Sequence, residues 1–94
     1  MSNARRNRYL WRKYRITLKT WNKMFRAQRG RCAICLQKKS YRLHVDHDHK
    51  TERVRGLLCT FCNWRLLGRG RENPDHHERA ATYLRSTVDW RKAA

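Results

Sequence analysis

The residues best suited to chemistry lie between positions 44 and 63, in the stretch HVDHDHKTERVRGLLCTFCN. It places Asp46 among histidines and ends with Asn63, which directly follows a cysteine. Carboxylate and amide oxygens suit a hard cation such as Mg²⁺, which also keeps waters and binds substrate phosphates. A neutral imidazole, from His47 or His49, can take a proton from water. The stretch therefore predicts a site for a divalent cation with a base beside it.

All four cysteines of the chain fall into two CxxC pairs, separated by 23 residues. A two-residue spacer lets both thiolates of a pair reach one ion at about 2.3 Å, and two pairs complete a tetrahedron. Such a set leaves no open coordination position, so it predicts a structural zinc, with iron, two disulfides or a redox-active pair as alternatives. The predicted ligands are Cys32, Cys35, Cys59 and Cys62.

The charge of the chain points to a polyanionic partner. Its 94 residues carry 24 Lys and Arg against seven Asp and Glu, a formal net charge of +17. This excess favours nucleic acid, bound through phosphates, over a merely soluble basic surface or an anionic membrane. The sequence has no apolar run of the ~20 residues that a membrane span needs. It also lacks a secretion signal, so we expect a protein that is not secreted and works in a reducing, cytoplasmic compartment.

Residues 17–30 predict an amphipathic helix, with Thr17 as its cap and Gly30 as its stop. Apolar positions recur at three- and four-residue steps, and we interpret them as facing the core rather than as a stacking platform for bases. Leu18, Trp21 and Phe25 occupy these positions, and the polar Gln28 continues the same spacing. The opposite face is basic and is expected to lie along a phosphate backbone. It carries Lys19, Lys23 and Arg26.

Residues 41–58 predict a two-stranded hairpin with a turn at residues 50–53. Strict alternation would place Asp46 and His47 on opposite faces, so both can serve one site only if the strand ends or bends between them. Asp48 is expected to orient a histidine or to pair with an arginine. In the plainer interpretation, the whole cluster only neutralises arginines or caps turns.

Both ends of the chain are expected to flank this core. Residues 1–15 suit either a flexible basic arm or a helix that orders on DNA, and the sequence leaves both open. Near the other end, Asn73 can cap a helix with Pro74 in its first turn, and a shorter helix before it would end at Gly68. The predicted phosphate contacts of the N-terminal segment are Arg5, Arg6, Arg8 and Arg12. The predicted buried face of the last helix comprises Ala80, Tyr83, Leu84 and Val88.

Taken together, CAIC, VDHDH and VRGLLCTFCN, followed by a helix that ends in glycine, resemble the recombination endonuclease VII family of phages. That family belongs to the wider HNH, or His-Me finger, nucleases. The similarity spans residues 16–84. It implies an α+β fold, namely a small zinc-stapled ββα-metal nuclease domain with flanking helices, in which a hairpin and a helix clasp one divalent ion.

The resemblance also implies roles for single residues. Asp46 and Asn63 match the ligands of a catalytic Mg²⁺ or Mn²⁺. His47 matches the histidine that activates water and His49 a second histidine near the scissile phosphate, although some relatives place the base where His49 stands. The four cysteines match the structural zinc ligands. Arg55, on the returning strand, is expected either to hold the phosphate or to be a plain surface arginine.

The expected function is metal-dependent hydrolysis of DNA phosphodiester bonds, by nicking or double-strand cleavage, in a bacterial or phage-infected cell. The expected organisation is a basic segment at 1–15, a nuclease domain at 16–88 and a tail at 89–94. Junction-cleaving members of the family carry a long C-terminal part, whereas this chain stops at Ala94. Cleavage of duplex DNA is therefore at least as expected as cleavage of four-way junctions.

Two points stay open in the sequence. The chain is expected to act as a monomer or as a homodimer. The alternative to a nuclease is a non-catalytic zinc-ribbon module that only binds nucleic acid. Such a binder would need neither the carboxylate of Asp46 nor the side chains of His47 and Asn63, so these three residues separate the two functions.

Overall fold

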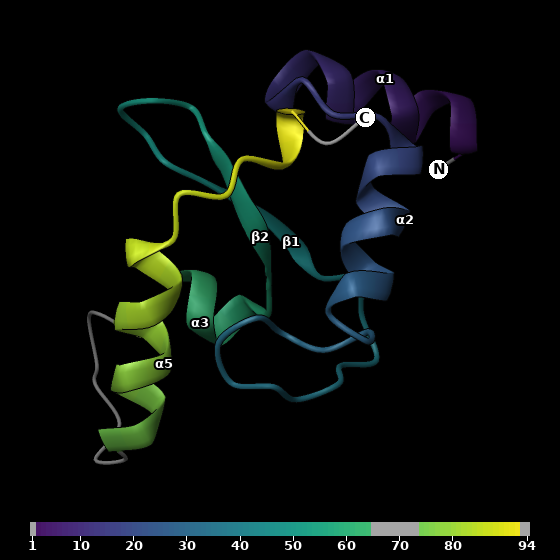
Figure 1. The fold of residues 1–94 in the computed structure, drawn as a ribbon. Coiled ribbons are helices and arrows are strands. Elements are labelled where there is room, and N and C mark those ends of the chain that lie inside the picture. The colour runs from purple at the N-terminus through teal and green to yellow at the C-terminus, as the bar shows by residue number, and fades with distance from the viewer. Residues whose placement is uncertain (1, 65–73, 93–94) are drawn as a thin grey trace.

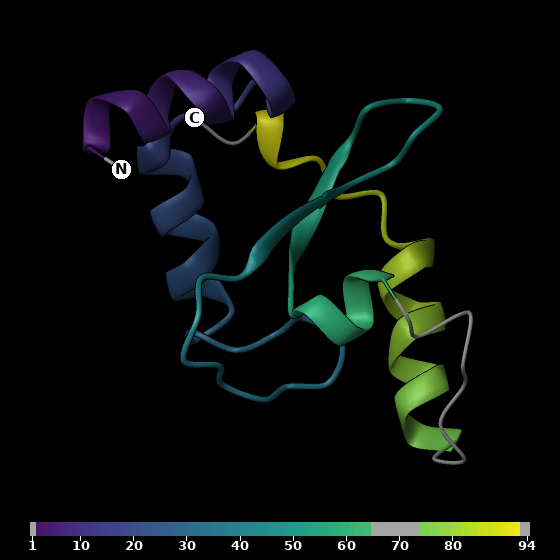
Figure 2. The same ribbon diagram turned by 180° about the vertical axis from the view of Figure 1, so that it is seen from behind.

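The computed structural model describes residues 2–64 and 74–92 and shows a small α+β domain built around a two-stranded hairpin (Figure 1). Figures 1 and 2 both show the hairpin in the middle, with α2 on one side and α5 on the other. The hairpin agrees with the predicted one. In chain order the elements are α1 (Asn3–Tyr14), α2 (Leu18–Ala27), β1 (His44–His47), β2 (Val54–Leu58), α3 (Thr60–Trp64), α5 (Pro74–Arg85) and the 3₁₀ helix η1 (Trp90–Lys92).

Helix α2 begins after the predicted cap, Thr17, and the chain turns away from it at the predicted glycine, Gly30. The Thr17 hydroxyl accepts a hydrogen bond from the Thr20 amide at 3.1 Å, and the chain leaves the helix through Gly30, whose φ of +72° suits glycine. Trp21 is buried, but Phe25 stacks on it and stays 37% exposed. The helix therefore turns its apolar face to the core, although Phe25 lies at the edge of that face.

Gln28, just past α2, joins the helix to the hairpin. Its side-chain amide donates to the Leu57 carbonyl at 2.9 Å and accepts from the Leu57 amide at 2.9 Å. The backbone amide and carbonyl of Leu57, on the edge of β2, therefore both have hydrogen-bond partners. Met24, Val54 and Leu57 are fully buried, so both α2 and β2 contribute to the core.

Helix α1 is part of the folded domain. Leu10 is buried in the core, and the Asn7 side chain accepts a hydrogen bond from the Leu18 amide at 2.7 Å, at the start of α2. The guanidinium of Arg6 lies 4.3 Å from the ring centre of Trp21. Of the two possibilities for this segment, the structure shows the helix.

The C-terminal residues also pack on the hairpin. The Asp89 carboxylate accepts hydrogen bonds from the Val54 amide at 3.2 Å and from the Arg91 side chain at 2.8 Å. The Arg91 hydrogen bond is the main cause that lowers the pKa of Asp89 to about 2. Both flanking segments, predicted as separate from residues 16–88, therefore contact the central domain.

Helix α5 reaches the core along a narrow stripe. It begins at Pro74, as predicted. Ala80 is buried and Tyr83 packs against the core, whereas Leu84 and Val88 are 40% and 50% exposed. The predicted buried face is therefore wrong at its C-terminal end, because contact with the core stops after Tyr83. Two other predicted features, the cap and the end of the shorter helix, lie outside the described residues: Asn73 and Gly68.

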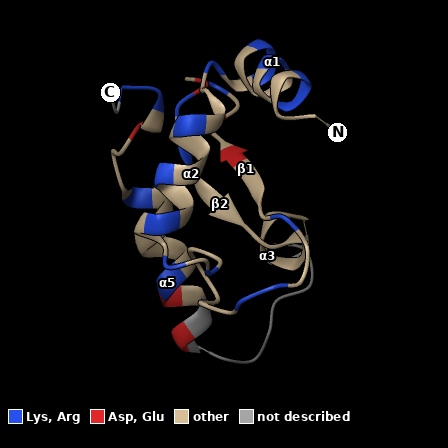
Figure 3. Ribbon diagram, turned by 90° about the vertical axis from the view of Figure 1, so that its right-hand side faces the viewer, with Lys and Arg blue, Asp and Glu red and all other residues tan. Residues whose placement is uncertain are grey.

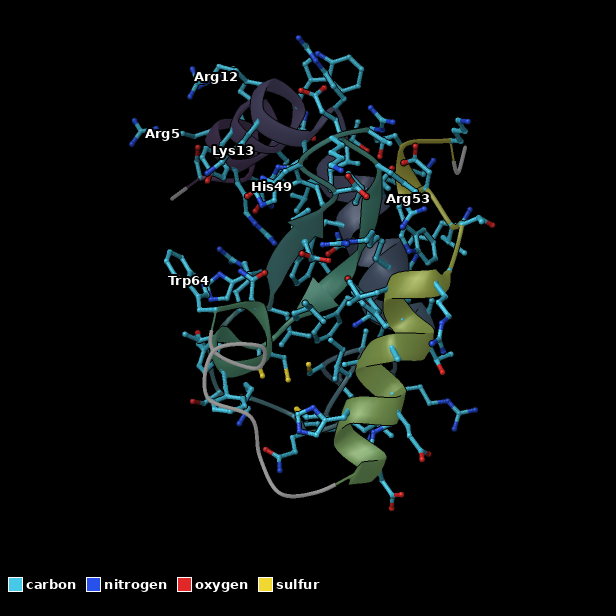
Figure 4. The ribbon with its side chains drawn as sticks, turned by 90° about the vertical axis from the view of Figure 1, so that its left-hand side faces the viewer. Arg5, Arg12, Lys13, His49, Arg53 and Trp64 are labelled. Atoms are coloured by element: carbon cyan, nitrogen blue, oxygen red, sulfur yellow. The ribbon has the colours of Figure 1, made fainter. Side chains whose placement is uncertain are left out.

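The four cysteines converge at the base of the hairpin, where Figure 4 shows sulfur atoms gathered near α3. Their sulfur atoms all lie within 4.8 Å of one another, and none is in a disulfide. Cys35 Sγ and Cys59 Sγ are 3.8 Å apart. A tetrahedral ion with Zn–S bonds of about 2.3 Å requires an edge of about 3.8 Å. The cluster therefore suits a structural zinc ion, which would tie residues 32–35 to the start of α3.

We predict that the protein contains about one zinc ion per chain, the number that one Cys₄ tetrahedron holds. Cys32→Ser should remove the ion and unfold the protein, because a core this small depends on its metal. Leu36→Ser, an exposed change beside the first pair, should keep both zinc and fold. Metal analysis and circular dichroism check this, and a reduced, metal-free protein that stays folded would contradict it.

Candidate active site

The hairpin is irregular at the candidate site. Asp46 pairs with Gly56 and His47 pairs with Val54, so Arg55 is an extra residue on β2. Such a bulge bends the strand and increases its twist. The register shift falls between Asp46 and His47, where strict alternation must break if both are to serve one site. That the two side chains share one site stays a prediction.

The Asp46 carboxylate is the centre of a hydrogen-bond network. The residue is 9% exposed, and Arg55 donates to both its oxygens, from Nε to Oδ2 at 2.7 Å and from Nη2 to Oδ1 at 3.1 Å. The Tyr83 hydroxyl donates to Oδ2 at 2.8 Å. Bidentate, charge-assisted hydrogen bonds of this kind fix a carboxylate firmly. One carboxylate thereby joins β1, β2 and α5.

Arg55 is not a plain surface arginine. Its side chain is 17% exposed and pairs with Asp46. Burial alone would lower its pKa, but the hydrogen bond and charge of Asp46 outweigh that effect, so the pKa of Arg55 is raised. Its Nη2 also lies 3.4 Å from the His47 carbonyl oxygen, across the bulge. Arg55 therefore holds the backbone and carboxylate of the site together.

Tyr83 is a site residue that the sequence indicates only as buried. Burial, then the neighbouring charge of Asp46, raises the pKa of its hydroxyl, which therefore stays protonated and donates. Gly56 makes room for the ring, since a Cβ there would lie 3.0 Å from Tyr83 Cε1 and 3.1 Å from its hydroxyl. The hydrogen bond between Tyr83 and Asp46 cannot be predicted from local sequence, because the two residues are 37 positions apart.

His47 and His49 lie side by side, with ring centres 4.8 Å apart. The Tyr14 ring packs edge-on against His47 at 5.4 Å, a contact between α1 and β1 that the sequence does not reveal. His47 borders a cavity of about 150 Å³ whose described lining includes four cations and one acid. The cations are Arg12, Lys13, Arg15 and Arg91, and the acid is Glu52. His47 thus faces a positively charged hollow.

Asp48 belongs to the turn and not to this network. Its Oδ1 accepts hydrogen bonds from the amides of Lys50 at 2.8 Å and Thr51 at 3.1 Å. These two hydrogen bonds are the main causes that lower the pKa of Asp48. The expectation that its side chain orients a histidine or pairs with an arginine is therefore wrong, because the turn amides take its hydrogen bonds first.

Asn63 lies on α3, the short helix that packs against both strands. Its backbone amide donates to the Cys59 carbonyl at 2.9 Å, so the second cysteine pair sets the position of Asn63. The side chain is half-buried, and no described residue forms a hydrogen bond with it. Asn63 thus offers an amide oxygen that the described part of the protein does not use.

The oxygen donors of the site fit a hard cation. Asp46 Oδ2 already accepts two hydrogen bonds, whereas Oδ1 accepts one and keeps a lone pair for an ion. Among the described residues, the cysteines are the one group of three or more His, Cys, Asp or Glu ligands. An ion at Asp46 would therefore rely on amide, water and phosphate oxygens, as Mg²⁺ commonly does.

Lys and Arg are spread over α1, α2 and α5, whereas acids are few (Figure 3). Arg6 differs from the other predicted phosphate contacts because it is buried against Trp21. The exposed ones are Arg5, Arg8, Arg12, Lys19, Lys23 and Arg26. Within the described residues, no helix has the length and apolar character to cross a membrane.

Figure 4 shows that the side chains of Arg5, Lys13, His49 and Trp64 project toward the same side of the molecule. Trp64, at the end of α3, is 76% exposed and follows Asn63 directly. Helix α1 thus places cations, and helix α3 an aromatic ring, on this side of the molecule.

Comparison with known proteins shows the family of the chain. Residues 7–86 match the family described as recombination endonuclease VII. The chain is 49% identical over 74 residues to the Gene 59 protein of Mycobacterium phage D29, covering 77% of this chain and 45% of that protein. It is 48% identical over 73 residues to the Gene 59 protein of Mycobacterium phage L5, covering 76% and 44%.

The chain spans less than half the length of these two curated relatives. No solved structure matches it significantly. The family match covers most of the chain, including both cysteine pairs, the bulged hairpin, α3 and the Tyr83 contact. The chain therefore belongs to the recombination endonuclease VII family.

Proposed function

We propose that the chain is a metal-dependent DNA endonuclease in which β1, β2 and α3 form a ββα-metal site. The observation that carries the proposal is the Asp46 carboxylate, which Arg55 and Tyr83 hold in place next to the register shift that separates Asp46 from His47. Family membership supports a nuclease, and the net charge of +17 supports DNA as its partner.

In the proposed reaction, His47 takes a proton from the attacking water. Asp46 Oδ1 and the Asn63 amide oxygen would hold Mg²⁺ or Mn²⁺. When bound, the ion would offset the negative charge that develops on the phosphate and the leaving oxygen. Arg55 and Tyr83 keep the Asp46 carboxylate oriented, and the four cysteines keep α3 in place through the structural zinc.

His47 is favoured over His49 as the base for two reasons. It directly follows Asp46, across the bend, and Tyr14 packs on its ring and restricts its orientation. His49 is exposed and lies beyond the end of β1, where it suits a contact with the scissile phosphate.

Zinc-loaded protein should nick or cut supercoiled plasmid in the presence of Mg²⁺ or Mn²⁺ and not without them. The ratio of nicked to linear product in the same assay would distinguish nicking from double-strand cleavage. Whether the protein acts as a monomer or as a homodimer also stays a prediction. Tight DNA binding without metal-dependent cleavage would favour the zinc-ribbon binder instead.

We expect His47→Ala to lower the cleavage rate by about 10²–10⁴-fold, the usual worth of a general base. Zinc content, fold and DNA affinity should stay close to those of the parent, because the side chain touches neither the cysteines nor the core. His49→Ala should have a smaller effect. Equal rates for the parent and both site variants would show that the hydrolytic site lies elsewhere.

Asn63→Ala should slow cleavage and raise the Mn²⁺ concentration at which the rate is half-maximal, because one oxygen ligand is lost. Asn63→Asp should restore metal binding, since a carboxylate can replace the amide as ligand. Calorimetric titration with Mn²⁺ would measure the affinity apart from activity. If all three proteins bind Mn²⁺ equally, Asn63 is not a ligand.

Tyr83→Phe removes a hydrogen bond to a charged group, so we expect a loss of unfolding free energy of about 1.5–3 kcal/mol. Cleavage and Mn²⁺ affinity should fall, because the Asp46 carboxylate gains freedom. Gly56→Ala should act in the same direction by displacing the ring, whereas Thr82→Ala on the exposed side of α5 should not. Unchanged Mn²⁺ affinity in Tyr83→Phe would limit Tyr83 to a role in stability.

A further inference from the structure

A groove between α1 and the start of β1 takes no part in the chemistry proposed above. It has a volume of about 270 Å³, and none of its described lining residues is acidic. Two arginines, Arg6 from α1 and Arg42 just before β1, line it together with aromatic and aliphatic side chains. A groove that combines paired cations with aromatic rings is suited to a nucleotide, which has an anionic phosphate and a flat base.

The two arginines lack a counter-charge in this groove. Arg6 is 9% exposed, and its Nη2 atom has no hydrogen-bond partner among the described residues. Burial, then the positive charge of Arg42, lowers the pKa of Arg6. Arg42 itself is exposed and free to reach a ligand from the rim. An anion bound between the two guanidinium groups would relieve their repulsion.

The aromatic wall of the groove comes from α1. Tyr9 is 38% exposed, and its ring meets Tyr14 edge-on with ring centres 6.4 Å apart. An exposed ring held by a second ring presents a rigid surface for a sugar or base at little conformational cost.

The groove continues toward the candidate active site. Tyr14 lines both this groove and the smaller cavity that contains His47. Arg6 and Tyr14 are eight residues apart on α1, a distance of about 12 Å along a helix with 1.5 Å rise per residue. With α1 aligned along the DNA axis, on which one strand of B-DNA has a phosphate every 3.4 Å, this distance corresponds to about three or four nucleotides.

We infer that the groove binds one nucleotide of the cleaved DNA strand, about three or four positions from the bond cut at His47. Its phosphate lies between Arg42 and Arg6, and its sugar or base lies against Tyr9. The position of the cut rests on the proposed nuclease function, whereas the groove and its charge do not.

The test replaces single phosphates of a defined duplex by neutral methylphosphonates and measures the affinity of the zinc-loaded, 94-residue protein without added Mg²⁺. For the parent, a methylphosphonate at one position of the cleaved strand, about three or four nucleotides from the cut, should weaken binding by about three- to tenfold. In Arg42→Gln this position should lose its effect, while other sensitive positions keep theirs. Arg85→Gln makes the same change of charge on an exposed part of α5 and should leave the whole pattern unchanged.

Several results would overturn the inference. A pattern that is the same in Arg42→Gln and in the parent would show that the groove holds no phosphate. If only methylphosphonates at the nucleotides flanking the cut weaken binding, the cleaved strand does not pass through the groove. A protein that binds but does not cut, yet shows one Arg42-dependent phosphate, would support the groove and reject the proposed nuclease. Zinc content and thermal unfolding confirm that each variant is folded.

Discussion

The convergence of four cysteine sulfurs within 4.8 Å is the constraint on which the rest of this small protein depends. It joins the loop at residues 32–35 to the end of β2 and the start of α3. Because Asn63 directly follows the last cysteine, the same constraint that stabilises the fold also sets the position of a candidate ligand. A change at the cysteines would therefore affect stability and site geometry together.

A second centre, the Asp46 carboxylate, joins the hairpin to α5 through Arg55 and Tyr83. A partly buried arginine and carboxylate are costly to desolvate, and their value lies in holding a fixed arrangement rather than in net stability. Gly56 shows how far the surrounding sequence adapts to this arrangement, because a Cβ at that position would meet the tyrosine ring. Arg55 of the Asp46 network lies on β2 and Cys59 of the cysteine cluster directly follows that strand, so both centres restrain the hairpin.

Much of this could be predicted from local sequence. The CxxC spacing indicates the cysteine cluster, and alternation indicates the hairpin and the need for a bend after Asp46. The contacts that local pattern cannot reveal are long-range ones, such as Tyr83 with Asp46 and Tyr14 with His47. The sequence predicts that Asp48 orients a histidine or pairs with an arginine, but amides two and three residues away compete better for its oxygen. The sequence also predicts Arg6 as a phosphate contact, but it does not reveal that Arg6 packs on Trp21, because that depends on how α1 and α2 cross.

The central claim is that the Asp46 carboxylate serves a hydrolytic metal site distinct from the cysteine cluster. The most direct measurement compares plasmid cleavage in Mg²⁺ by the parent and by Asp46→Asn, with zinc content and circular dichroism recorded on the same samples. We predict that Asp46→Asn keeps its zinc and its fold, binds DNA and fails to cleave it. Cleavage at the rate of the parent by a zinc-loaded, folded Asp46→Asn protein would contradict the account.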